Sequence, residues 1–117
     1  MTTVYQETLP ESYLLLLTPG PATAPEVTLQ YGLDCACHSG KPAVWVDCEL
    51  VHGLSAEAVQ ILWHYHLLLQ NQNMKLVVVH ACDAVKEELL SLHQSPSLCF
   101  APTLLDAAWQ STLRQVA

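Results

Sequence analysis

Two apolar runs separated by a helical pattern constrain the fold of this chain most strongly. Ala43 to Leu50 is rich in β-branched and aromatic residues, and Lys75 to His80 is almost continuously apolar. Runs of this kind are typical of parallel strands that are buried on both faces. Ser55 occupies an N-cap position and predicts a helix that continues to about Asn71. The chain therefore contains a strand–helix–strand unit, which joins parallel neighbours by a right-handed crossover.

The N-terminal segments add two strands and a helix to this unit. Val4 to Thr8 and Ser12 to Thr18 read as a hairpin, in which we expect the first strand to lie at the edge of the sheet. Pro25 and Glu26 open a segment of near-helical periodicity, and Ser39-Gly40 ends it. This pattern predicts a helix between the hairpin and the first buried strand.

The C-terminal segments continue the alternation. Asp83 to His93 is a predicted amphipathic helix, and a short strand follows at Leu98 to Phe100. Its expected inward-facing residues are Val85, Leu89, Leu90 and Leu92. Thr103 and Asp106 form a predicted capping box for a last helix, Leu104 to Val116. The order β-β-α-β-α-β-α-β-α predicts an α/β fold with a small mixed, mostly parallel sheet and about four helices.

Length and composition limit the class of protein. The 117 residues suit a single domain, 1–117, with a core large enough to fold without disulfides. Hydrophobic residues make up 51% and charged residues 13%, which excludes a disordered chain and leaves apolar surface for a partner. A formal charge of −7 would repel a phosphate backbone or an anionic membrane, so we expect no nucleic acid among the ligands.

The lengths of the apolar runs and the number of cysteines indicate in which cellular compartment the chain is expected. The longest apolar run, Tyr13 to Leu17, is far shorter than the roughly 20 residues of a spanning helix, so no direct membrane insertion is expected. The start of the chain shows no charged leader before an apolar stretch. Five cysteines leave one unpaired, and four lie in apolar contexts typical of buried free thiols. These features favour the reducing cytoplasm.

Several local sequences resemble one known family. Val44-Trp45-Val46-Asp47 resembles the central strand of STAS domains, the family of anti-sigma factor antagonists, which ends in an aspartate. The match continues through Val51, Ser55 and Leu62 to the run Lys75 to Val79, and Cys82 to Leu90 is similar to the family's next helix. The resemblance covers nearly the whole chain. It implies a STAS-like fold and a non-catalytic, protein-binding regulatory role.

The resemblance also implies that the usual phosphorylation switch is missing. Family members carry Asp-Ser-Ser/Thr-Gly at the start of the helix after the central strand, and a partner kinase phosphorylates the second hydroxyl. The corresponding residues here are Ser55-Ala56-Glu57-Ala58, so Glu57 stands in the place of that hydroxyl. Ser55 is a candidate phosphosite, although a serine before a helix is typically an N-cap. Glu57 could imitate a phosphate, although a carboxylate in a first helical turn is favoured by the helix dipole alone.

The helix from Ser55 is apolar nearly all the way round. The family match places five residues against the sheet: Val59, Leu62, Trp63, His66 and Leu69. It leaves a second stripe of Ala58, Ile61, Tyr65 and Leu68, which is either a partner-binding face or is covered by a neighbouring helix or a second copy. The expected partner-binding residues are His52, Gly53, Leu54, Ser55, Glu57, Ile61, Tyr65 and Leu68. Gly53 is expected to provide a special backbone conformation in the turn.

The partner that the resemblance implies is an anti-sigma kinase-like protein or a signalling scaffold, with a homodimer or a role in a lipid-transport complex as alternatives. The rival from another class is a small enzyme or ligand carrier that uses Cys48 or His52 at the carboxyl end of the central strand. No catalytic motif supports it. Cys35, Cys37 and His38 lack the spacing of a zinc site, so neither a metal nor a cofactor is expected. His64 and His66 point to different sides of one helix, and one of them should be packed.

Overall fold

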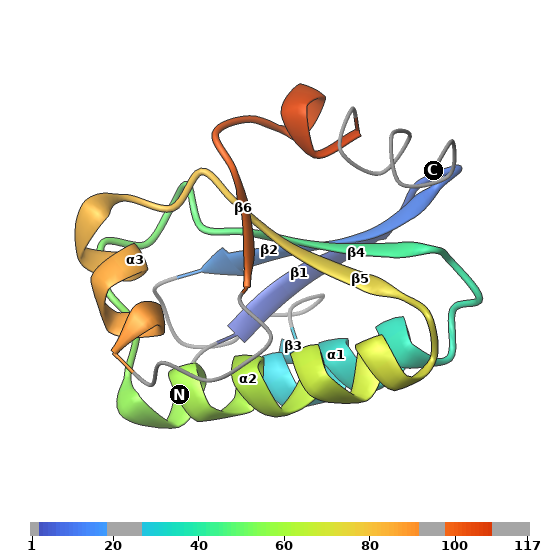
Figure 1. The fold of residues 1–117 in the computed structure, drawn as a ribbon, viewed down its shortest axis with the longest axis horizontal. Helices are drawn as coiled ribbons and strands as arrows, with labels where there is room; N and C mark the ends of the chain where they lie inside the picture. Colours follow the sequence, from blue (N-terminus) through green and yellow to red (C-terminus); the bar gives the residue numbers. More distant parts are fainter. Residues whose placement is uncertain (1–2, 19–26, 92–97, 109–117) are drawn as a thin grey trace.

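A computed structural model describes residues 3–18, 27–91 and 98–108 of the chain. These residues form a six-stranded sheet with helices α1 and α2 side by side on one face and the helical turn at 104–108 on the other (Figure 1). The strands are β1 Thr3–Thr8, β2 Ser12–Thr18, β3 Val27–Thr28, β4 Ala43–Asp47, β5 Lys75–Val79 and β6 Cys99–Ala101. The helices are α1 Leu29–Cys37, α2 Ala56–Asn71 and α3 Asp83–Leu90.

The strand order confirms the predicted mixed, mostly parallel sheet. It runs β3-β1-β2-β4-β5-β6, with antiparallel pairing of β1 to β2 and to β3 and parallel pairing elsewhere. Strand β4 lies between β2 and β5, and all five of its residues are buried. Val44 and Val46 join the core under α1 and α2, whereas Ala43 and Trp45 join a second core on the opposite face. Period-two alternation thus explains why this strand is apolar throughout.

The first strand is not an edge strand, contrary to expectation. Strand β3 pairs with it through Thr3 opposite Thr28 and Val4 opposite Val27. Helix α1 accordingly begins at Leu29, and the Thr28 hydroxyl caps it by accepting the Tyr31 N–H at 3.2 Å. Two β-branched residues favour an extended backbone, which explains why the helix begins later than predicted. Pro25 and Glu26 lie outside the described residues.

Helix α1 packs closely on the hairpin. A Cβ at Gly32 would lie 2.8 Å from Val4 Cγ2 and 3.1 Å from a Leu15 methyl. The contact leaves no room for a side chain at this position, so the glycine is needed despite its low helix propensity. Helix α1 lies beside α2 on the same face of the sheet (Figure 1).

Several element ends differ from expectation. Strand β4 stops at Asp47 rather than Leu50, because the Asp47 side chain accepts the Glu49 N–H at 2.9 Å and starts a turn. Strand β5 stops at Val79, since His80 has a φ of 57°. In α3 Val85 and Leu89 are buried as predicted, but Leu90 is 44% exposed, and Leu92 lies outside the described residues.

Thr103 caps the following helix as predicted, but its partner Asp106 bonds to the Thr103 hydroxyl rather than to the backbone N–H of a full capping box. The Thr103 hydroxyl accepts the Asp106 N–H at 3.2 Å and donates to the Asp106 carboxylate at 2.9 Å. Helical residues follow at 104–108, and the rest of the predicted last helix lies outside the described residues.

The second apolar stripe of α2 is largely covered, which corrects the expectation that Tyr65 is exposed. Ala58 is 1% and Tyr65 5% exposed, and the Tyr65 hydroxyl donates a hydrogen bond to the Asp34 carboxylate of α1. Burial, together with Asp34, raises the pKa of Tyr65 to about 12, which keeps the phenol protonated and able to donate. Ile61 is half-buried, and Leu68 is 37% exposed. The stripe is therefore mainly an α1–α2 contact, while the five residues expected against the sheet are all buried.

These environments predict different costs of substitution along one helix. Tyr65→Ser removes a buried ring and its hydrogen bond, so we expect it to lower the free energy of unfolding by about 2–4 kcal/mol, close to Leu62→Ala. Leu68→Gln should change this free energy by no more than about 0.5 kcal/mol. Urea unfolding followed by circular dichroism measures all three. An unchanged midpoint for Tyr65→Ser would show that α1 does not cover this stripe.

Candidate functional site

The carboxyl ends of β4 and β5 and the loop into α2 form the candidate site. Beyond β4, the Cys48 N–H donates to the Val79 carbonyl at 2.8 Å, so the strand pairing continues one residue further. The Val51 N–H then donates to the Cys48 carbonyl at 3.2 Å and closes a turn. Ligands of open α/β sheets bind at this end of the strands. The loop, residues 48–55, is therefore fixed to the sheet at its start.

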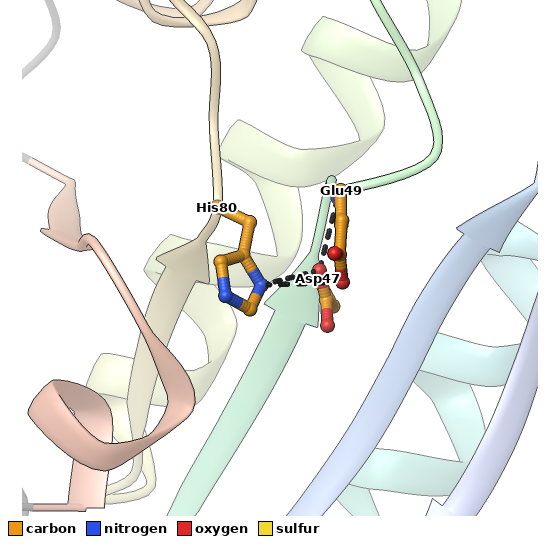
Figure 2. A group of neighbouring side chains, drawn as sticks. All are labelled: Asp47, Glu49 and His80. Atoms are coloured by element: carbon orange, nitrogen blue, oxygen red, sulfur yellow. Dashed lines mark hydrogen bonds and ion pairs between the residues drawn. The ribbon is translucent and has the colours of Figure 1, made fainter.

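Three polar side chains meet where β4 and β5 end (Figure 2). One oxygen of the Asp47 carboxylate lies 3.0 Å from Nδ1 of His80, and that nitrogen lies 3.9 Å from a Glu49 oxygen. The side chains are 6%, 26% and 65% exposed for Asp47, His80 and Glu49. Glu49 and His80 were not predicted as site residues. The sequence held one signal for them, because parallel strands bring the residues at their carboxyl ends to one edge of the sheet. Asp47 is paired with Val79, so His80, the next residue, lies at the same edge.

Glu88 of α3 holds the second half of the loop. The Leu54 N–H lies 3.3 and 3.2 Å from the two Glu88 carboxylate oxygens, and Leu54 itself is 8% exposed. A Cβ at Gly53 would lie 3.1 Å from the same carboxylate. Gly53 was expected to provide a backbone conformation that a β-branched residue resists, but among the described residues Gly40 is the glycine with positive φ. The limited space beside the Glu88 carboxylate, rather than an unusual φ angle, favours a residue without a side chain at position 53.

The start of α2 confirms the capping role of Ser55. Its hydroxyl accepts the Ala58 N–H at 3.1 Å, and Glu57 lies exposed in the first turn, where the helix dipole favours a carboxylate. His52, Gly53 and Ser55 are also exposed. Beside them, a hollow of about 410 Å³ separates α2 from α3; its lining residues are Ala56, Val59, Gln60, Glu87, Glu88 and Ser91.

Cys48 and His52, the residues of the rival enzyme hypothesis, lie in different environments. Cys48 is 1% exposed, and burial raises the pKa of its thiol to about 12, with the Asp47 charge adding to the effect. A thiol in this state is a poor nucleophile at neutral pH. His52 is exposed, and its carbonyl accepts from the Cys82 thiol at 3.8 Å.

The remaining cysteines and histidines only partly follow expectation. All five cysteines are free, but only Cys48 is buried; Cys35, Cys37 and Cys99 are half-buried and Cys82 is exposed. The prediction that four of these thiols are buried, which rested on apolar neighbours in the sequence, was therefore wrong for all but Cys48. His66 is packed and His64 exposed, as predicted. Within the described ranges, the one group with metal-ligand spacing is Asp47, Glu49 and His80.

Among the described residues, no helix is both long and apolar enough to cross a membrane.

Known proteins resemble this chain in structure and not in sequence. By sequence, it matches no protein family and no curated protein. An anti-sigma factor antagonist from Mycobacterium paratuberculosis superimposes with a TM-score of 0.75 at 20% identity, over 96% of this chain and 95% of the other. A serine-to-glutamate variant of RsbS from Moorella thermoacetica gives 0.73 at 10% identity, over 97% and 98%.

A third solved structure comes from an assembly. A chain of the stressosome, described as a signal integration and transduction hub, gives a TM-score of 0.74 at 9% identity, over 97% of this chain and 100% of the other. Each of these matches covers almost the whole length of this chain and of the protein compared with it. The chain therefore has the STAS fold that such proteins share.

Proposed function

We propose that this chain is a non-catalytic regulatory module that binds another protein in the manner of an anti-sigma factor antagonist, in the cytoplasm of a bacterial cell. Residues 1–117 would act as one STAS-like domain. The partner is an anti-sigma kinase-like protein or a signalling scaffold. The fold shared with an antagonist, with RsbS and with a stressosome chain supports this function. The buried Cys48 thiol supports a role other than catalysis.

The observation that carries the proposal is an exposed, weakly charged surface on a rigid support. This docking surface consists of the half-buried Ile61 and six exposed residues: Leu50, His52, Gly53, Ser55, Glu57 and Leu68. Leu50 is 48% and Leu68 37% exposed, and Glu57 is the single charged member. Contiguous exposed apolar patches typically mark interaction sites on protein surfaces. Tyr65 is left out because α1 covers it, and Leu54 supports the loop from inside.

The support beneath this surface is well defined. The loop is paired to β5 through Cys48 and to α3 through the Glu88 carboxylate, and Ser55 starts α2 with a capped turn. A rigid surface loses little conformational entropy when it binds. A preformed interface of this kind suits a module that binds constitutively.

The first test compares docking-surface variants as bait for proteins of the source cell. Leu68→Asp and Glu57→Lys should each reduce the amount of the main captured protein at least about tenfold. The first places a negative charge on an apolar part of the docking surface, and the second reverses the charge of its one carboxylate. Tyr31→Ser is the matched control, since Tyr31 is 56% exposed on the neighbouring helix α1. Quantitative mass spectrometry of the retained proteins measures the effect, and sedimentation reports self-association of each variant.

Two outcomes would contradict the proposal. Equal capture by all variants would place the interface elsewhere on the chain. A wild-type chain that captures no specific protein and sediments as a monomer would remove the protein-binding function itself. A dimer broken by Leu68→Asp would instead assign the same surface to a second copy of the chain.

The second test concerns phosphorylation. The Ser55 hydroxyl is engaged as an N-cap, and Ala56 and Glu57 offer no hydroxyl at the positions that follow. Incubation with a STAS-type kinase and ATP should therefore leave the intact mass unchanged, while a phosphorylatable STAS protein in the same reaction gains a phosphate. A gain of one phosphate that Ser55→Ala abolishes would restore a switched antagonist.

A further inference from the structure

The carboxylate of Asp47 is buried without a permanent positive charge beside it. Its side chain is 6% exposed, and among the described residues its ion-pair partner is His80, which is charged only when protonated. Within the part of the chain that the structure describes, no lysine or arginine pairs with it. Lys41 donates to the Pro10 carbonyl, and Lys75 opens β5 at the other end of the sheet. Buried charges are normally paired or coordinate a metal ion, and the group beside Asp47 is an imidazole, which is itself a metal ligand.

The separations around Asp47 fit a small cation. Ligands of a tetrahedral zinc ion, each about 2.0–2.1 Å from the metal, lie about 3.3 Å from one another. The Asp47 oxygen and Nδ1 of His80 are 3.0 Å apart, and the Glu49 oxygen is 3.9 Å from the same nitrogen. One ligand atom from each residue lies within 4.8 Å of the other two. Because the Glu49 side chain is exposed, a small rotation can shorten its 3.9 Å distance from Nδ1 of His80 to the separation of two zinc ligands.

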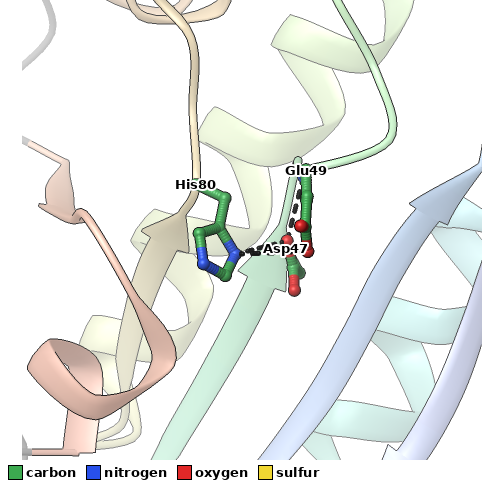
Figure 3. Close-up of polar contacts among 3 residues, drawn as sticks. All are labelled: Asp47, Glu49 and His80. Carbon is green, nitrogen blue, oxygen red and sulfur yellow. Dashed lines mark hydrogen bonds and ion pairs between the residues drawn. The ribbon is translucent and has the colours of Figure 1, made fainter.

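The backbone already holds two of these ligands in place. The Asp47 carboxylate accepts the Glu49 N–H, which fixes its rotamer. The His80 N–H donates to the Ala101 carbonyl of β6 at 3.2 Å, and its φ of 57° turns the ring toward β4 (Figure 3). The site is therefore built from the ends of two paired strands rather than from a flexible loop.

From this geometry we propose that Asp47, Glu49 and His80 bind one divalent first-row transition-metal ion, of which Zn²⁺ is the representative used below. An imidazole nitrogen with two carboxylate oxygens is a donor set for Zn²⁺ rather than for Mg²⁺ or Ca²⁺, which take oxygen ligands. Three protein ligands leave a fourth position open on the side where His80 and Glu49 are exposed. The ion would neutralise the buried carboxylate and fix the start of the loop that carries the docking surface.

The test uses the intact chain after treatment with a chelator. Calorimetric titration with ZnCl₂ should show one site per chain, and Zn²⁺ should raise the melting temperature. Glu49→Gln and His80→Asn should each weaken binding at least about tenfold and remove the thermal shift. Both variants should fold, because Glu49 is exposed and asparagine tolerates the left-handed backbone at position 80. The matched controls are Glu57→Gln and His64→Asn, two exposed residues of α2 outside the cluster.

Co²⁺ separates this site from the free cysteines. A site made of nitrogen and oxygen ligands gives weak visible bands without the strong near-ultraviolet charge-transfer band of a cobalt–thiolate bond. Absence of binding by the wild-type chain would overturn the proposal. So would binding that survives His80→Asn, or a thiolate band that disappears in Cys82→Ser. None of these outcomes depends on a protein partner, so they are distinct from failure of the proposed function.

Discussion

Burial of β4 on both faces is the constraint on which the rest of the structure depends. Its five residues pair with β2 on one side and β5 on the other, and they contribute to both cores. Asp47 is the one polar residue of this buried strand, and it stands at the last position, where its carboxylate has the Glu49 N–H and Nδ1 of His80 as hydrogen-bond partners. The chain must turn there. The turn places the loop 48–55 and the start of α2 at the edge where β5 ends and His80 follows it.

Features that depend on neighbours in sequence were predictable. The strand–helix–strand unit, the Ser55 cap and the Thr103 cap follow from local patterns, and each is present. The burial of Tyr65 was not predictable, because it depends on the contact between α1 and α2, two helices that are distant in sequence. The Asp47–Glu49–His80 group required the register of two strands distant in sequence. Its residue types were visible, but their proximity was not.

The docking surface and the polar group share one loop. Asp47 and Glu49 stand at its start, and His52 and Gly53 are exposed further along it. Glu88 fixes the other half from α3. Interactions that hold the loop therefore also hold the surface that a partner would meet. If Glu57 stands at the position of the phosphorylatable hydroxyl, as the resemblance to STAS domains implies, the surface would remain permanently in one state.

Backbone hydrogen exchange in the complex with the captured partner tests the central claim most directly. The free chain and the complex are compared by mass spectrometry at matched pH and temperature. If the docking surface is the interface, exchange should slow in residues 48–61 and stay unchanged in α1. Slower exchange confined to α1 or to the β1–β2 hairpin, with residues 48–61 unaffected, would contradict the account.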